Sequence, residues 1–221
     1  GRDNIKSFKT KDILKSNDKS IELFDNINTL YIHNPRCSDK KIEKFFDILS
    51  DYKSKKYIKN IGISIARGFY FKKSILDRFD FVQDEVNVLF FKNINYLKKL
   101  NAKIIARSPL ASGCLSGHLS IDKNFESQDY RKEWLQGERL QNILRQIDIL
   151  ERIFQKDIRS IAKSFVYFNP NLHKIIFGVR SKKHIDELNE DIKKIDKLKK
   201  NKLKELELIS NYNFFLSSNG Y

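Results

Sequence analysis

The stretch KIIARSPLASGCLSG, residues 103–117, joins a short apolar run to a series of small and polar residues. Four other short apolar runs also end in a polar or small residue, and they are Ile27–His33, Ile61–Ser64, Phe81–Gln83 and Lys174–Gly178. Between the runs lie segments of helical length, with apolar residues three and four positions apart. This alternation of strand and helix predicts parallel strands joined by crossover helices, and therefore an α/β fold.

The ends of the predicted strands carry side chains suited to ligand binding, and these residues are His33, Ser64, Gln83, Ser108 and Gly178. In parallel sheets the carboxyl ends of the strands line the ligand site. The sequence therefore predicts a ligand site at this edge of the sheet.

Apolar periodicity predicts the helices that connect these strands. They cover Asp12–Phe24, a stripe over Ile42–Leu49, Asn93–Leu100, Leu140–Phe154 and Ile158–Val166, and Ser181 is placed to cap one more. The segment Phe71–Phe79 is expected to be a short helix or a loop. The polar segment Gly113–Gly137 is longer than ordinary connections, and such loops usually cover a functional site or are disordered. Without an internal repeat or linker, a single domain over residues 1–221 is expected.

The composition excludes several classes of protein. The chain has 221 residues, 40% of them hydrophobic, which is enough for one sizeable core. Its two cysteines, Cys37 and Cys114, give no disulfide framework and no metal-ligand spacing, which favours a reducing cytoplasm and a protein without a metal. No apolar run reaches the roughly 20 residues of a membrane span, and the start shows no signal-peptide pattern. Because the first residue is Gly1, we expect that it is not the natural beginning of the chain.

The net charge of +15 allows two interpretations. It could mark a surface for nucleic acid or an anionic membrane. Alternatively, lysines are common in nearly every segment and concentrate only near Lys193–Lys204, which is expected to form the solvated face of a helix. We favour the second interpretation and expect no nucleic-acid or membrane partner, although the charge can help to attract an anionic cofactor.

Each strand end also has an ordinary structural explanation. A neutral imidazole at His33 can donate to a carbonyl oxygen or assist proton transfer, but a buried histidine can equally serve the fold. Ser64 could bond within its own loop, and Gln83 could belong to a polar network with Asp84, Glu85 and Asn87.

Two segments have features of phosphate-binding sites. The small residues of Ser108–Gly117 let the backbone approach a ligand, and their amides can hold a pyrophosphate, although many turns have this composition. The segment Phe177–His184 combines a strand end, a helix start and several cationic groups, which suits a phosphate monoester. An ordinary capped turn is the alternative for this second segment.

Taken together, these motifs resemble the C-terminal two-thirds of an aldo-keto reductase. The resemblance rests on Ile32–Pro35, Gly62–Ser64, Val82–Asn87, Ser108–Gly117 and Gly178–His184, and it extends from about Lys11 to Leu198. It implies a TIM-type (β/α)8 barrel, of which this chain carries about five β/α units, numbers four to eight. It also implies that NADPH is bound without a Rossmann motif and that a small carbonyl compound, an aldehyde or ketone, is reduced to an alcohol by hydride transfer.

The resemblance assigns a role to each matching residue. His33 matches the histidine that orients the substrate carbonyl, Ser64 and Gln83 match residues that hold the nicotinamide carboxamide, and Arg107 stands where members place a Tyr or an Arg against the nicotinamide ring. The residues that match the pyrophosphate loop are Ser108, Leu110, Ser112, Gly113 and Leu115. Those that match the site of the adenosine 2′-phosphate are Gly178, Arg180, Ser181 and His184, and Glu187 matches an adenine contact.

Three positions depart from the family pattern. Ile65 replaces an Asn that contacts the carboxamide, Leu188 stands where an adenine-binding Asn is usual, and Val86 replaces a frequent Tyr. The family's general-acid Tyr, its Lys and its Asp belong to the first three units, so the chain alone is expected to be inactive. The alternative is a non-catalytic, truncated relative that serves as a nucleotide-binding or interaction subunit. The substrate and the oligomeric state do not follow from the sequence.

Overall fold

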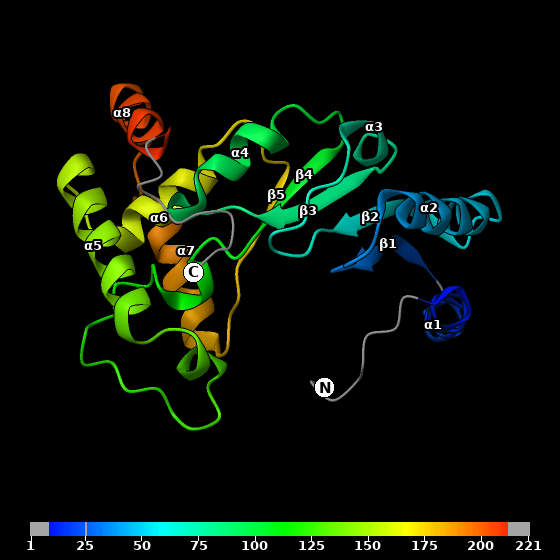
Figure 1. Cartoon of the computed structure of the whole chain (residues 1–221), viewed down its shortest axis with the longest axis horizontal. Coiled ribbons are helices and arrows are strands. Elements are labelled where there is room, and N and C mark those ends of the chain that lie inside the picture. Colours follow the sequence, from blue (N-terminus) through cyan, green and yellow to red (C-terminus); the bar gives the residue numbers. More distant parts are fainter. Residues whose placement is uncertain (1–8, 25, 212–221) are drawn as a thin grey trace. The chain divides into compact units, whose positions relative to one another are not determined.

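The computed structural model describes residues 9–24 and 26–211, so Gly1 lies outside the described residues (Figure 1). Its strands are β1 (Ile27–His33), β2 (Ile58–Ser64), β3 (Phe81–Glu85), β4 (Lys103–Arg107) and β5 (Lys174–Ile176). Its helices are α1 (Thr10–Leu23), α2 (Asp39–Ser54), α3 (Lys73–Leu76), α4 (Lys92–Leu97), α5 (Gly137–Phe154), α6 (Ile158–Tyr167), α7 (Lys182–Lys194) and α8 (Lys200–Asn211).

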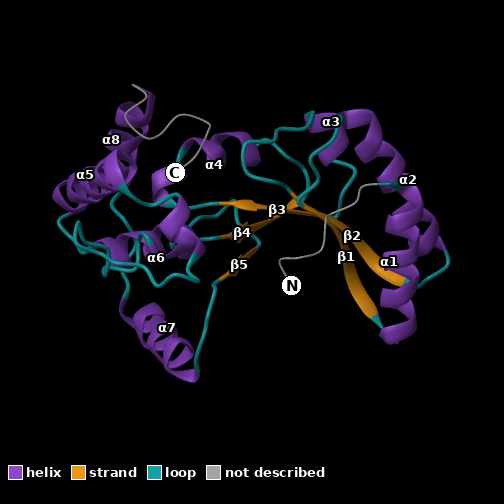
Figure 2. Cartoon of the chain, turned by 60° about the horizontal axis from the view of Figure 1, so that its bottom comes forward, coloured by secondary structure: helices purple, strands orange, loops and turns teal. Residues whose placement is uncertain are grey.

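The strands are hydrogen-bonded in the order β1-β2-β3-β4-β5. The pairs β1–β2, β2–β3 and β4–β5 are parallel, and helices lie between successive strands along the chain (Figure 2). The prediction of an α/β fold is therefore confirmed. Among the described residues, no helix is long and apolar enough to cross a membrane.

The chain divides into two compact units. The first unit contains residues up to Asp84 together with Lys99–Ile104, and the second contains Glu85–Lys98 and the residues from Ile105 onward. The prediction of a single domain over residues 1–221 stays a prediction.

In the first unit, helix α2 packs against strand β2. The residues Ile42, Phe45 and Leu49 recur at helical spacing and are almost fully buried. Gly62 of β2 lies opposite Tyr31 of β1, and a Cβ atom at Gly62 would overlap the Tyr31 ring. The glycine therefore allows a large ring to lie across the neighbouring strand.

In the second unit, α5 packs against both α6 and α8. The apolar stripe of α5 that the sequence predicts is buried at Leu140, Ile143 and Leu150. Helix α6 is capped by Asp157, whose carboxylate accepts a hydrogen bond from Ser160 N at 2.9 Å.

The run Lys193–Lys204 is not the face of one helix, so that prediction is wrong. Helix α7 ends at Lys194, Ile195 is extended, and α8 begins at Lys200. The intervening segment is fixed by tertiary contacts, since Ser164 Oγ donates to the Asp196 carbonyl and Leu198 is only 5% exposed. These contacts replace the helical hydrogen bonds that local sequence alone would favour.

Candidate functional site

Three predicted site residues lie at the ends of adjacent strands in the first unit. The strand register pairs His33 of β1 with Ser64 of β2, and Ser64 with Gln83 of β3. Ser64 Oγ donates to Gln83 Oε1 at 2.7 Å. The structure thus brings His33, Ser64 and Gln83 into one row at the carboxyl edge of the strands, as the sequence predicts.

The chain turns away from the sheet immediately after this row. Asn34 has a left-handed backbone with φ 50°, and its N–H donates to the Ser64 carbonyl at 2.7 Å. His33 is exposed at the strand end, whereas Ser64 is only 1% exposed. Ile65, which replaces the expected Asn, is completely buried and therefore contributes to the core.

The second unit holds the loop that the sequence assigns to pyrophosphate. Ser108, Ala111 and Ser112 all have left-handed backbones, with φ of 53°, 49° and 58°. Such values are uncommon for residues with a side chain and cost about 1–3 kcal/mol each, so surrounding contacts must maintain them. Backbone strain of this kind tends to gather at ligand sites.

Most amides of this loop are used by the loop itself. The N–H groups of Gly113 and Leu115 both donate to the Leu110 carbonyl, at 2.8 and 3.2 Å, and Ala111 N donates to the Ser108 carbonyl at 2.9 Å. Within the described chain, the amide of Ser112 has no hydrogen-bond partner. This amide is therefore a candidate donor to an anion.

A side chain from the long polar segment also reaches this loop. Arg131 Nη1 lies 3.4 Å from the Ser112 carbonyl, and a Cβ atom at Gly113, where φ is 94°, would come within 2.8 Å of the same nitrogen. Gly113 is required both for its backbone conformation and for this close approach.

The guanidinium of Arg131 is itself held in place. Its Nε donates to Asp129 Oδ1 at 3.0 Å, and the group lies 4.7 Å from the centre of the Phe125 ring. Hydrogen bonds from Arg131 lower the pKa of Asp129 to about 2. Sequence reasoning assigned no role to Arg131, because its partners are close only after the segment folds back.

The second phosphate motif stands at the start of α7. Ser181 Oγ accepts from His184 N at 3.4 Å, which confirms the predicted cap, and His184 Nδ1 accepts from Arg180 N at 3.3 Å. Arg180, Ser181 and His184 are all exposed, and so is Gly178, where a Cβ atom would meet nothing within 4 Å. The structure therefore brings these residues together as a capped helix start with a cation beside it.

Glu187 of α7, which the resemblance assigns to adenine, forms an ion pair with Arg159 of α6. Its carboxylate lies 3.3 Å from Arg159 Nη2, and the same guanidinium lies 2.6 Å from Asp191. Lys163 also bonds to Asp191 and is almost fully buried. Burial and the charge of Arg159 lower the pKa of Lys163 to about 8. These ion pairs join α6 to the face of α7 that carries Glu187.

The remaining predicted residues belong to the loop in the second unit or to the strand before it. Arg107 ends β4, where its carbonyl accepts from Val86 N at 3.1 Å. Leu115 is fully buried and Leu110 is half-buried. Leu115 thus anchors the loop in the core.

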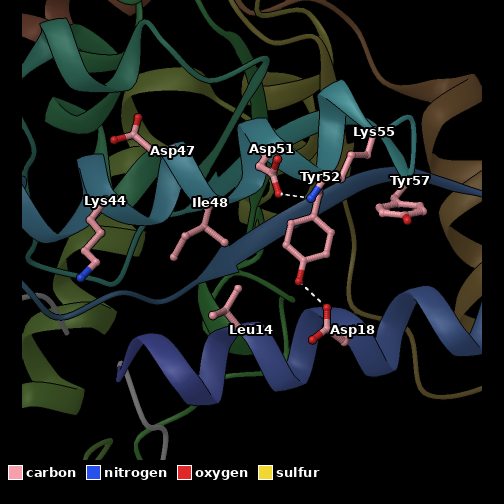
Figure 3. Close-up of a pocket in the computed structure, with 9 residues that line it drawn as sticks. All are labelled: Leu14, Asp18, Lys44, Asp47, Ile48, Asp51, Tyr52, Lys55 and Tyr57. Atoms are coloured by element: carbon pink, nitrogen blue, oxygen red, sulfur yellow. Dashed lines mark hydrogen bonds and ion pairs between the residues drawn. The ribbon is translucent and has the colours of Figure 1, made fainter.

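A groove of about 570 Å³ lies elsewhere in the first unit, between α1 and α2 (Figure 3). Its lining includes Leu14, Ile48 and Tyr52, and none of the predicted site residues. Tyr52 donates to Asp18 across it, and burial and this carboxylate raise the pKa of Tyr52 to about 12 (Figure 3). A phenol with such a pKa stays protonated, so we assign this pair to the packing of α1 on α2.

Comparison with known proteins gives a family and a fold. The model of the Aldo/keto reductase family matches residues 2–211. No curated protein matches the chain. Among solved structures, the glycerol dehydrogenase AKR11B4 from Gluconobacter oxydans is similar with a TM-score of 0.72 and 19% identity, over 96% of this chain and 67% of that protein.

The aldo-keto reductase AKR11C1 from Bacillus halodurans is also similar. Its apo form gives a TM-score of 0.63 at 13% identity over 89% of this chain and 67% of that one, and its holo form gives 0.65 at 12% identity over 92% and 68%. At such identities the likeness shows the fold alone. The chain spans about two-thirds of these proteins, and its five parallel strands with their helices form part of a (β/α)8 barrel, as the family resemblance implies.

Proposed function

Because this chain belongs to the aldo/keto reductase family, we propose that it carries the cofactor-binding part of an NADPH-dependent reductase that converts an aldehyde or ketone to an alcohol. The observation that carries this proposal is the row of His33, Ser64 and Gln83 at three adjacent strand ends. Polar side chains at this edge of a parallel sheet are placed where such folds bind ligands.

We assign the nicotinamide end of the cofactor to Ser64, Gln83 and Arg107. The bond from Ser64 fixes the Gln83 oxygen, which leaves the Gln83 NH₂ group to donate to a carboxamide oxygen. When bound, NADPH supplies the hydride that reduces the carbonyl carbon. His33 would donate a hydrogen bond to the carbonyl oxygen and so orient the substrate.

The phosphate end of the cofactor is assigned to the second unit. The Ser112 amide, in a loop rich in left-handed backbone, is suited to an oxygen of the pyrophosphate. Arg180 and the N-terminus of α7 would hold the 2′-phosphate, since a helix N-terminus and a guanidinium both favour an anion. Each unit therefore carries residues suited to one end of a phosphorylated dinucleotide.

The proton for the product alkoxide is not assigned to any described residue. The family resemblance places that Tyr, with its Lys and Asp, on the first three barrel units. We therefore expect residues 1–221 alone to show no turnover. We also propose that the protein works in a reducing cytoplasm, because two cysteines give no disulfide framework.

The proposal is tested on the full gene product and on residues 1–221 in parallel. We expect the full product to oxidise NADPH with a generic aldehyde or quinone. The 1–221 chain should bind NADPH without turnover. A full product that binds NADPH but reduces no carbonyl would support the alternative of a nucleotide-binding subunit, and one that binds no nucleotide would refute the reductase and leave the interaction subunit.

A further inference from the structure

A buried amide joins the end of β3 to the strained loop of the second unit. The Asn87 side chain is completely buried. Its Nδ2 donates to the Ser108 carbonyl at 3.2 Å and to Glu85 Oε1 at 3.1 Å, and its Oδ1 accepts from Phe90 N at 3.0 Å. Asn87 thus links the carbonyl of Ser108, the first residue of the loop, to Glu85 at the end of β3.

The Ser108 carbonyl accepts hydrogen bonds that stabilise the conformation of the loop. It also accepts from Ala111 N at 2.9 Å, which closes the turn that leads into Ser112. Ser108 itself has a left-handed backbone, an uncommon conformation for a residue with a side chain. A donor that holds this carbonyl therefore stabilises both the turn and the direction in which the Ser112 amide points.

We infer that Asn87 is a positioning residue for the pyrophosphate end of the cofactor, acting through the Ser108 carbonyl. The inference rests on the proposed function, because it assumes that the loop holds a dinucleotide. A purely structural role would be served by the bonds of Asn87 that cap the short helix after β3 and hold Glu85. The bond to Ser108 connects Asn87 to the loop.

The chain contains a matched control in Asn93. Its side chain is 2% exposed, and its Nδ2 donates to the Glu85 carbonyl at 2.6 Å, so it is buried beside the same strand end. No bond in the described structure joins Asn93 to the loop. The variants Asn87→Ser and Asn93→Ser each remove one buried amide, but only the first removes a contact with Ser108.

The experiment compares these two variants of the full protein by cofactor binding and by hydrogen exchange without cofactor. Asn87→Ser should raise the Kd for NADPH and for NADH alike by about tenfold, because both share the pyrophosphate, while Asn93→Ser changes neither. Without cofactor, the amides of Gly113 and Leu115 should exchange faster in Asn87→Ser than in Asn93→Ser. Should Asn87→Ser not fold, Asn87→Asp keeps the volume and the acceptor but loses the donor.

The two readouts separate the possible failures. Equal exchange and equal affinities in the two variants would overturn the role of Asn87. A wild-type protein that binds neither nucleotide would refute the proposed function. Faster loop exchange in Asn87→Ser would in that case still confirm that Asn87 shapes the loop. A selective loss of NADPH affinity would also overturn the inference, since it would place the effect at the 2′-phosphate.

Discussion

Ser64 on β2 donates a hydrogen bond to Gln83 on β3, with 2.7 Å between Ser64 Oγ and Gln83 Oε1. The bond turns the amide oxygen of Gln83 toward β2 and leaves its NH₂ group as the side offered to a ligand. The Ser64 hydroxyl therefore bonds to the neighbouring strand, and not within its own loop as the structural interpretation of the sequence allowed. Ser64 and Gln83 therefore form a hydrogen-bonded pair at the candidate nicotinamide position.

Replacing Ser64 should therefore affect a cofactor through Gln83. Ser64→Ala leaves the Gln83 oxygen without this donor, and we expect NADPH and NADH to bind about fivefold more weakly. Thr29→Ala is the control, because that hydroxyl lies near the opposite end of the adjacent strand and bonds to Asn28 at 2.9 Å. Cofactor fluorescence titrations measure both, and equal losses in the two variants would contradict the role of Ser64.

The contact between Tyr31 and Gly62 predicts a steric defect. Gly62→Ala would place a Cβ atom in the Tyr31 ring, and overpacking of this kind costs about 1–3 kcal/mol. Gly178→Ala is the control, since its Cβ meets nothing within 4 Å, and its stability should be unchanged. Urea denaturation gives the free energies of unfolding. Adding Tyr31→Leu to Gly62→Ala should recover part of the loss, and an additive further loss would refute the steric explanation.

Local sequence predicts the strands of this protein well. Apolar runs ended by polar residues identify β1 at its observed bounds, and β3 and β4 begin at the predicted residues. The ligand-binding end of the strands follows from the same pattern, because parallel strands bring their carboxyl ends to one edge. The adjacency of His33, Ser64 and Gln83 can therefore be predicted without any information on tertiary contacts.

Contacts between distant segments could not be predicted in this way. The segment containing Arg131 has no periodicity, so nothing in its sequence indicates that it returns to Ser112. The break between α7 and α8 likewise depends on the bond from Ser164 to Asp196 rather than on a helix-breaking residue. Side-chain donors that fix a backbone carbonyl, such as Asn87, are visible only when the partner carbonyl is in place.

The cation at the start of α7 predicts a selectivity for the phosphorylated cofactor. Charge-assisted contacts with a phosphate contribute about 1.5–3 kcal/mol, so Arg180→Ala should weaken NADPH by roughly tenfold or more and leave NADH nearly unchanged. Lys194→Ala removes the same charge at the other end of α7, where the lysine is 75% exposed, and should change neither affinity. Equal losses of affinity for both cofactors would refute the assignment of Arg180 to the 2′-phosphate site.

The buried lysine of α6 predicts a stability that rises in mild alkali. The pKa of Lys163 is about 8 in the folded protein and 10.5 in its unperturbed state, so between these values the unfolded chain binds more protons and folding becomes more favourable as pH rises. Relative to Lys163→Met, the wild type should gain about 2 kcal/mol between pH 8 and pH 9.5. Asp191 keeps its pair with Arg159 in this variant, which limits other damage. Lys193→Met keeps Lys163 and removes a lysine that is 70% exposed, so this variant should show the same gain as the wild type, and denaturant midpoints at the two pH values measure all three proteins. If the wild type and Lys163→Met respond to pH in parallel, Lys163 stays charged in the folded state, and its bond to Asp191 outweighs its burial.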